Sequence, residues 1–291
     1  MNRHPRPLFN SLCLAMLAIG IGPAHALDWS DTSVNWRYGS NFAEPFNNKA
    51  ISKHILGLTH ADGYRYGGNF FNVDYLMSDG NDPARFGSTS GARETYIVYR
   101  HKLDLGKLRG SDIRFGPVRG FALTAGFDWN TKEDVGYNSR KQMFVIGPTL
   151  MIDVPGFLDV SLLLLEESNK PSVSAGAFNP GYPNSRYRYK THPMLGLAWG
   201  IPISERFSFG GFANFIAAKG VNEVGRNTAA ETNIDMNLTY DLGQTLGLPA
   251  KSFRAGFQYQ FWKNKFGNDH TGPAGKGAYA RTPMIRTEYH F

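Results

Sequence analysis

The stretch "GGNFFNVDYLM" at residues 67–77 alternates between two kinds of side chain. One parity carries Phe70, Asn72 and Asp74, which place an aromatic ring beside an amide and a carboxylate. A flat polar solute such as a nucleoside suits this set, because its ring can stack on the aromatic face and its hydroxyls can hydrogen-bond to the polar groups. The other parity is apolar and holds Phe71, Val73, Tyr75 and Met77.

Later stretches repeat the alternation and add charged groups to the polar parity. In residues 93–103, for example, Glu94, Tyr96 and Arg100 share one face. The simpler interpretation of any one such residue is that it pairs with an opposite charge and fills the interior, since internal ion pairs are common in barrels. The residues that we predict to contact a solute are Phe70, Asn72, Asp74, Glu94, Tyr96, Arg100, Asp128, Asp235, Arg254, Gln258 and Trp262.

A side-chain period of two residues is typical of a β-strand with one apolar and one polar face. About twelve such segments follow one another with no helical pattern between them, and closure into a barrel would remove their free edges. We therefore predict an all-β protein, a single antiparallel transmembrane β-barrel of about 12 strands. The segments lie near 34–38, 51–60, 67–77, 93–103, 120–130, 140–152, 157–167, 187–201, 206–217, 230–242, 252–263 and 279–291.

The connections between these segments differ in length in a regular way. Those after odd-numbered strands are mostly long, and those after even-numbered strands are mostly short, with only residues 104–118 breaking the rule. Long loops on one side and short turns on the other are expected of a bacterial outer-membrane barrel. The long connections are expected at 39–50, 78–92, 131–139, 168–186, 218–229 and 264–278.

The last stretch, "YARTPMIRTEYHF" at residues 279–291, ends on an aromatic carboxyl terminus. Ile285, Tyr289 and Phe291 share a parity, a pattern similar to the sorting signal at the end of bacterial outer-membrane barrels. We predict that the barrel-assembly machinery recognises this strand.

The first 26 residues have the pattern of a secretory signal peptide. Arg3 and Arg6 precede an apolar run of about ten residues, too short for a transmembrane helix, and small residues flank an expected cleavage site after Ala26. Residues 27–291 would then form the outer-membrane barrel. The single cysteine, Cys13, would leave with the peptide, so the exported chain needs no disulfide or thiol chemistry.

Composition supports an outer-membrane barrel over an ordinary periplasmic enzyme. The chain has 14% aromatic residues and 33 glycines, which suit interface girdles and tight turns. Its formal charge is +7, of which two positive charges lie in the signal peptide, and no basic cluster points to nucleic acid. The remaining excess of positive charge is explained by a basic lumen, or by a rim that faces anionic lipopolysaccharide. No spacing of His, Cys or Asp predicts a metal site, and we predict no cofactor.

Four stretches together resemble the Tsx-type family of outer-membrane nucleoside-specific channels: "NWRYGSNF" (35–42), "GGNFFNVDYL" (67–76), "GPVRGFALTAGFDWNTK" (116–132) and "IRTEYHF" (285–291). The resemblance implies a monomeric twelve-stranded barrel that passes nucleosides, with outer loops that phages and bacteriocins exploit. It favours Phe70, Asn72, Asp74, Glu94 and Tyr96 as the solute site. This chain departs from the family at Leu76-Met77, where a more acidic and aromatic run is expected.

Two other classes of protein fit the same barrel. The first is an outer-membrane enzyme of the lipase, protease or acyltransferase type, but the histidines are scattered along the sequence, so we predict no catalytic residues. The second is a closed barrel whose long loops bind partners. Single-channel conductance distinguishes the closed barrel from a channel.

Overall fold

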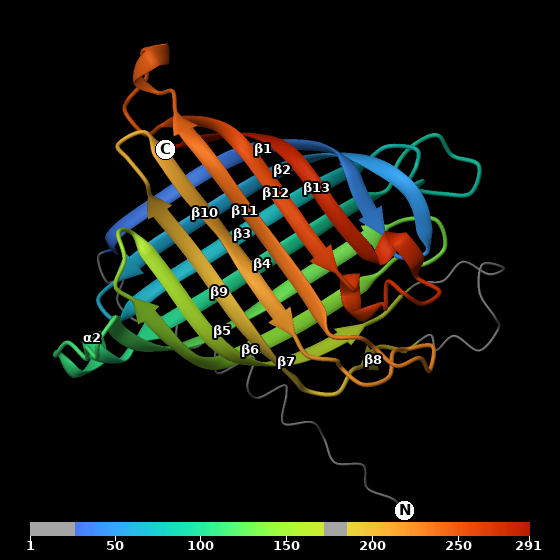
Figure 1. Cartoon of the computed structure of the whole chain (residues 1–291), viewed down its shortest axis with the longest axis horizontal. Helices are drawn as coiled ribbons and strands as arrows, with labels where there is room; N and C mark the ends of the chain where they lie inside the picture. The colour runs from blue at the N-terminus through green and yellow to red at the C-terminus, as the bar shows by residue number, and fades with distance from the viewer. Residues whose placement is uncertain (1–26, 172–184) are drawn as a thin grey trace, which may run out of the picture.

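A computed structural model describes residues 27–171 and 185–291, so the expected signal peptide lies outside the described residues. Long slanted strands wrap around a common axis in Figure 1. Their polar and apolar residues alternate, which favours strands over helices throughout. The strands are β1 (Leu27–Glu44), β2 (Asn47–Tyr64), β3 (Gly67–Ser78), β4 (Arg93–Asp104), β5 (Val118–Glu133), β6 (Arg140–Ile152), β7 (Phe157–Asn169), β8 (Tyr187–Arg188), β9 (His192–Pro202), β10 (Phe207–Ile216), β11 (Glu231–Asp241), β12 (Phe253–Lys263) and β13 (Tyr279–His290).

The sheet closes on itself. Sequential strands pair in antiparallel register, β1 pairs with β13, and β6 pairs with β7. β8 is a two-residue strand that pairs only with the end of β7, at Ser168 and Asn169. The other twelve strands of the described residues form the closed wall, which confirms the predicted all-β antiparallel barrel. Closure leaves none of these strands with an unpaired edge.

The strand register shows which side chains face the lumen. Lys102 on β4 and Asp159 on β7 lie 2.5 Å apart at Nζ and Oδ2, although β5 and β6 separate their strands along the wall. Arg37 on β1 likewise pairs with Asp74 on β3. Such contacts can form only through the interior. The parity that holds these residues therefore faces inward, and the other parity faces outward.

Strand β7 contains "LLLL" at residues 162–165, which interrupts the polar–apolar alternation. Leu162 and Leu164 are 58% and 56% exposed, whereas Leu163 and Leu165 are 3% and 0% exposed. The segment is thus a regular strand with apolar residues on both faces. The inward pair packs with Val145 and Met194 in a cluster inside the barrel.

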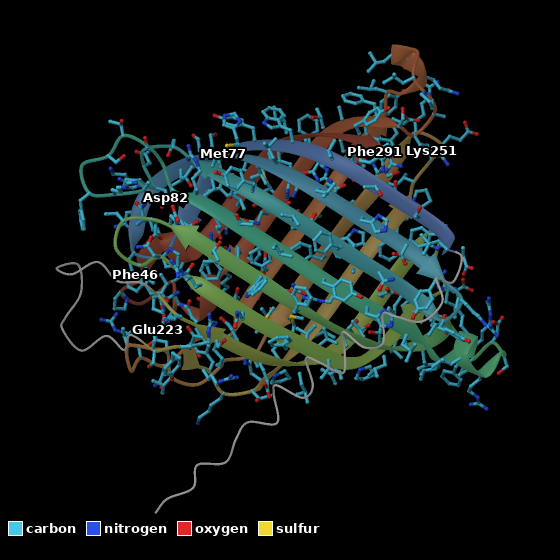
Figure 2. All side chains as sticks on the ribbon, turned by 180° about the vertical axis from the view of Figure 1, so that it is seen from behind. Phe46, Met77, Asp82, Glu223, Lys251 and Phe291 are labelled. Carbon is cyan, nitrogen blue, oxygen red and sulfur yellow. The ribbon has the colours of Figure 1, made fainter. Side chains whose placement is uncertain are left out.

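The barrel has two different ends, which we call the long-loop end and the short-turn end. Figure 2 shows Phe46, Asp82 and Glu223 at the long-loop end and Lys251 and Phe291 at the short-turn end. Residues 79–92, 134–139, 189–191, 217–230 and 264–278 lie between strands at the long-loop end, and residues 65–66, 153–156, 203–206 and 242–252 connect strands at the short-turn end. The predicted asymmetry of connections is confirmed for residues 79–92, 217–230 and 264–278 against 65–66, 153–156 and 203–206, whereas residues 134–139 form a shorter connection than residues 242–252.

The predicted loop at 39–50 is wrong. β1 and β2 continue through this stretch and meet at a two-residue turn, Pro45-Phe46, where Phe46 has a positive φ of 65°. An irregularity in pairing between Gly39 and Phe42 shifts the inward parity, so that Phe42 is buried. The predicted eighth strand, 187–201, is also divided into β8 and β9 by residues 189–191.

The connection between β4 and β5 is the long exception at the short-turn end, and it contains helix α2 (Leu105–Arg109). The Asp104 side chain caps the helix by accepting from the backbone N–H groups of Gly106 and Lys107. Gly110 ends it in the left-handed conformation that glycine adopts without strain. No helix within residues 27–171 and 185–291 is long and apolar enough to cross a membrane.

Candidate functional site

The outward face of the wall is apolar around most of its circumference. Leu56, Leu162, Phe257 and Ile285 are exposed on four different strands. Exposed apolar side chains over a closed wall require a lipid surrounding, because water would make this surface costly. The even number of wall strands and the two unlike ends are those of single-chain barrels of the bacterial outer membrane. The protein is therefore located there, with its long loops outside and its short turns in the periplasm.

All eleven residues predicted to contact a solute lie on inward-facing positions of their strands. In the middle of the lumen most of them are paired. Asp74 forms an ion pair with Arg37, and Asp128 forms one with Arg100. The Tyr96 hydroxyl donates to Asp128 Oδ2 at 3.0 Å, which places this ring among charged neighbours.

A second group of paired residues lines β11, β12 and β13. Gln258 Nε2 donates to the buried carboxylate of Asp235 at 2.6 Å, and Trp262 Nε1 donates to Glu231 at 2.5 Å. Arg254 lies 3.6 Å from Glu288. Each of the eight predicted residues in these two groups thus has a hydrogen-bond or ion-pair partner.

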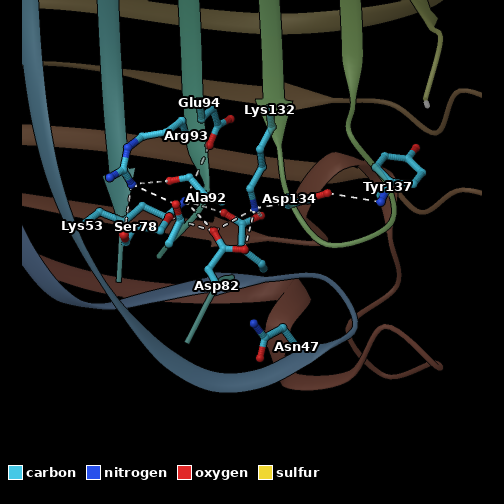
Figure 3. Close-up of polar contacts among 12 residues, drawn as sticks. Asn47, Lys53, Ser78, Asp82, Ala92, Arg93, Glu94, Lys132, Asp134 and Tyr137 are labelled. Atoms are coloured by element: carbon cyan, nitrogen blue, oxygen red, sulfur yellow. Dashed lines mark hydrogen bonds and ion pairs between the residues drawn. The ribbon is translucent and has the colours of Figure 1, made fainter. Parts of the chain in front are cut away.

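Glu94 belongs to a third group, at the long-loop end. Glu94 Oε1 accepts from Asn130 at 2.6 Å and lies 3.6 Å from Lys53 Nζ through its other oxygen. Lys53, which is 1% exposed, also donates to Glu44 at 2.6 Å. Lys132 lies 3.0 Å from Asp82, a residue of loop 79–92 that reaches into the lumen (Figure 3).

Glu44 is the centre of this third group, which we call the outer network: Glu44, Lys53, Asp82, Glu94, Lys132 and Lys265. Its carboxylate contacts three lysines, with Lys132 at 3.4 Å and Lys265 at 3.1 Å besides Lys53. Lys265 comes from η2 (Lys265–Gly267) in loop 264–278. Two loops are therefore tied to the inner wall by buried ion pairs.

Apolar packing fills more of the same half of the lumen. Phe42, Ile51, Ile55 and Met284 form a buried cluster, with Leu76 packed against it. The Lys53 ammonium also lies 5.6 Å from the centre of the Phe42 ring. The outer network and this cluster together fill part of the long-loop half of the lumen.

The short-turn half of the lumen is different. Phe70, near the short-turn end of β3, and Phe212, in the middle of β10, face inward and are still 41% and 36% exposed. A cavity of about 440 Å³ opens at this end, lined among others by Ser208, Gly210, Asn237 and Arg254. Small residues on β10 make room there for a solute. Of the predicted aromatics, Phe70 alone combines an inward position with a large exposed face.

Phe212 was missed from the sequence because "FSFGGFANFI" does not alternate clearly: Gly210 and Gly211 interrupt its pattern. Its inward position follows from pairing with Asp235 on one side and Ala198 on the other. Asn72, on the same inner wall as Phe70, accepts from Thr59 Oγ1 at 2.7 Å, which fixes its amide plane. No group of three or more His, Cys, Asp or Glu side chains in the described residues could hold a metal ion.

The fold is that of a closed antiparallel outer-membrane β-barrel. No protein-family model matches the chain, and no curated protein matches its sequence. Three solved structures share its overall form. They are a KdgM porin (10% identity, 89% of this chain and 99% of that chain, TM-score 0.41), a NanC porin (9%, 91% and 99%, 0.43) and the translocator domain of autotransporter NalP from Neisseria meningitidis (11%, 97% and 94%, 0.42). Likeness at this level carries no argument about function.

Proposed function

We propose that this protein is a passive outer-membrane channel for small polar solutes, and that nucleosides are the class it recognises. The observation that carries the proposal is the pair of exposed aromatic side chains, Phe70 and Phe212, on the polar inner wall. The resemblance of the sequence to Tsx-type channels supports the same solute class. The solute gradient would be the only driving force.

The chemistry of the wall fits such a solute. A base can stack on an aromatic face with a gain of about 1–3 kcal/mol, whichever base it is. Asn72, held by Thr59, and Arg254, beside the cavity, offer hydrogen bonds to sugar hydroxyls and ring atoms. The paired charges elsewhere in the lumen leave it nearly neutral locally, which suits an uncharged polar solute better than an ion.

The outer network sets a condition on transport. Because two loops and several buried ion pairs close the long-loop half, a solute from outside passes only when this network opens. We therefore expect a small conductance with brief openings. The closed half also favours one second function, a receptor for phage or bacteriocin that uses the outer loops while the barrel stays shut.

The test is single-channel recording of the full-length protein in a planar bilayer. Adenosine and thymidine are added in turn, with a sugar of similar size as the control. Current that the nucleosides reduce in a concentration-dependent way, and that the sugar does not, supports the proposed channel. Equal effects of all three solutes contradict nucleoside recognition. Absence of current contradicts the channel and favours the receptor.

A further inference from the structure

The outward face of β1 and β2 carries polar groups at a depth where a membrane wall is normally apolar. Thr32 Oγ1 lies 2.7 Å from His60 Nδ1, and His60 Nε2 lies 3.3 Å from Asp62 Oδ2. Asn69 on β3 donates through Nδ2 to the other carboxylate oxygen of Asp62 at 2.8 Å. These residues share the outward parity with the exposed Val34 and Leu58.

The chain of contacts continues across β3 and β4. The Tyr99 hydroxyl donates to Asn69 Oδ1 at 2.8 Å, and His101 Nδ1 lies 3.0 Å from the same oxygen. The Tyr64 hydroxyl lies 3.3 Å from His101 Nε2. We call this set the wall network: Thr32, His60, Asp62, Tyr64, Asn69, Tyr99 and His101.

The wall network occupies one sector only. Most outward positions within three residues of the short-turn end of other strands hold apolar or aromatic side chains, among them Phe121, Leu150, Val160, Phe209 and Tyr289, and the polar exception on β13, Thr287, is uncharged. A carboxylate and two imidazoles facing hydrocarbon would be costly. The difference between sectors therefore indicates that something polar covers the wall network.

Donors and acceptors in the wall network are unbalanced. Each ring N–H and hydroxyl hydrogen has an acceptor within the set, whereas Asp62 and the hydroxyl oxygens of Tyr64 and Tyr99 have lone pairs to spare. The His60 ring is 36% exposed beside the Asp62 carboxylate, which is 10% exposed. A complementary ligand group is thus a cationic hydrogen-bond donor that approaches beside His60.

Two cations lie just below the wall network, toward the periplasm. The exposed Arg65 guanidinium stacks over Tyr66 at 5.1 Å, and Lys107 Nζ donates to the backbone oxygen of Tyr64 at 2.9 Å while it also contacts Asp28. From Leu58 to Arg65 the strand rises about 23 Å, or about 18 Å in height at a tilt of about 40°. This height, from Leu58 to Arg65, is enough for the upper acyl chains, the phosphate and the headgroup of one lipid.

We propose that this sector binds one phospholipid with a phosphoethanolamine headgroup from the periplasmic leaflet. Its primary ammonium contacts Asp62 and the tyrosine hydroxyls, its phosphate contacts Arg65 and Lys107, and its acyl chains run along Val34 and Leu58. The charges match in pairs, because a zwitterionic headgroup meets an acidic site above a basic one. The site is independent of the lumen and of any solute that passes through it.

The test is native mass spectrometry of the intact protein in non-ionic detergent with three lipids of identical acyl chains. Phosphatidylethanolamine has both charged groups, phosphatidylcholine lacks N–H donors, and phosphatidylglycerol lacks the cation. We expect one retained phosphatidylethanolamine, bound at least about tenfold more tightly than the other two, since one charge-assisted hydrogen bond is worth that factor. Equal retention of the three lipids by the unmodified protein would overturn the proposal.

Variants separate the two halves of the site. Asp62→Asn should reduce phosphatidylethanolamine binding about tenfold and leave phosphatidylglycerol unchanged, whereas Arg65→Gln with Lys107→Gln should weaken all three lipids. Arg206→Gln, an exposed cation on the same rim, is the matched control and should change nothing. The shift of the folded barrel on unheated gels checks folding, and Tyr99→Phe provides a milder variant that removes one acceptor. Unchanged binding in folded Asp62→Asn would also contradict the proposal.

Discussion

Phe70 and Phe212 keep an exposed ring face on the inner wall, and the proposed solute site depends on them. Replacing both with Ala should remove the stacking surface and weaken nucleoside block of the current by about 1–3 kcal/mol per base, or roughly 5- to 150-fold. Phe257→Ala, an exposed ring on the outward face, is the matched control. Titration of the current with adenosine measures the effect, and equal block in the double variant and the control would remove these rings from the site.

Leu162 tests the outward face of the wall. It lies near the middle of the apolar outward positions of β7, from Leu158 to Leu164. Leu162→Arg should destabilise the barrel by about 2–4 kcal/mol, because the guanidinium would enter the bilayer midplane. Glu166→Arg, at the edge of the same face, should cost about 0–1 kcal/mol. Urea unfolding in lipid vesicles gives both values, and similar costs for the two would place the midplane elsewhere.

The sequence could predict which residues face the lumen, because a period of two assigns every residue of a strand once a few are known. It could not predict their partners. Asp74 pairs with Arg37 two strands away, and Asp82 reaches Lys132 from a loop, so these contacts depend on barrel closure. The sequence could not predict the wall network for the same reason, since Thr32 contacts His60 only across a strand pair.

At the scale of elements, the outer loops contain carboxyl groups whose burial affects their charge. Burial raises the pKa of Glu223 in loop 217–230 and of Asp134 in loop 134–139. The Tyr189 hydroxyl donates to Glu223 at 2.6 Å, and Tyr137 donates to its other oxygen. These contacts join three connections at the long-loop end, at a point where the Glu223 carboxylate has lost part of its hydration.

We expect the docked loops to become more stable as pH falls. When the loops are held together, the raised pKa means that this state binds the proton more tightly than the state with separated loops does. The stabilising effect of the proton is therefore present at low pH and is lost as the pH rises through the raised pKa. Limited proteolysis at pH 5 and pH 7 should show slower cleavage at pH 5. Glu223→Gln should reduce this difference, whereas Glu205→Gln in a short turn should not. Faster cleavage at pH 5 would contradict the sign.

Two elements show the limits of prediction from local patterns. Residues 39–50 are polar and rich in Asn, so they suggested a loop, but cross-strand pairing such as Phe42 with Ile51 extends both strands through them. Helix α2 is only one turn long and depends on the Asp104 cap, and a segment this short has no clear helical period. In both cases pairing or capping outweighs composition.

At the scale of the whole molecule, the two halves of the barrel interior differ. Buried ion pairs and apolar packing occupy the long-loop half, whereas Phe70 and a cavity lie toward the short-turn end. A twelve-stranded wall encloses more space than an eight-stranded wall, whose interior is filled by its own side chains. The two loops that insert Asp82 and Lys265 therefore decide whether the passage is continuous.

Glu44 is the residue on which this closure depends most. Glu44→Gln would leave Lys265 without its carboxylate partner, although Lys53 keeps Glu94 and Lys132 keeps Asp82. Loss of one partner of a buried ion pair costs about 3–5 kcal/mol, and here the cost falls on the attachment of loop 264–278 rather than on the strand register. We expect the wall to stay folded and the outer half to open.

Single-channel recording measures the consequence. Glu44→Gln should raise the open probability and the mean conductance severalfold over the unmodified protein, while Asp153→Asn, an exposed carboxylate in a short turn, should leave both unchanged. The gel shift of the folded barrel controls for unfolding. If folded Glu44→Gln conducts no better than the unmodified protein, the outer network does not limit transport. Continued absence of any current in both proteins would favour the closed barrel with receptor loops, because releasing the loop would then uncover no continuous passage.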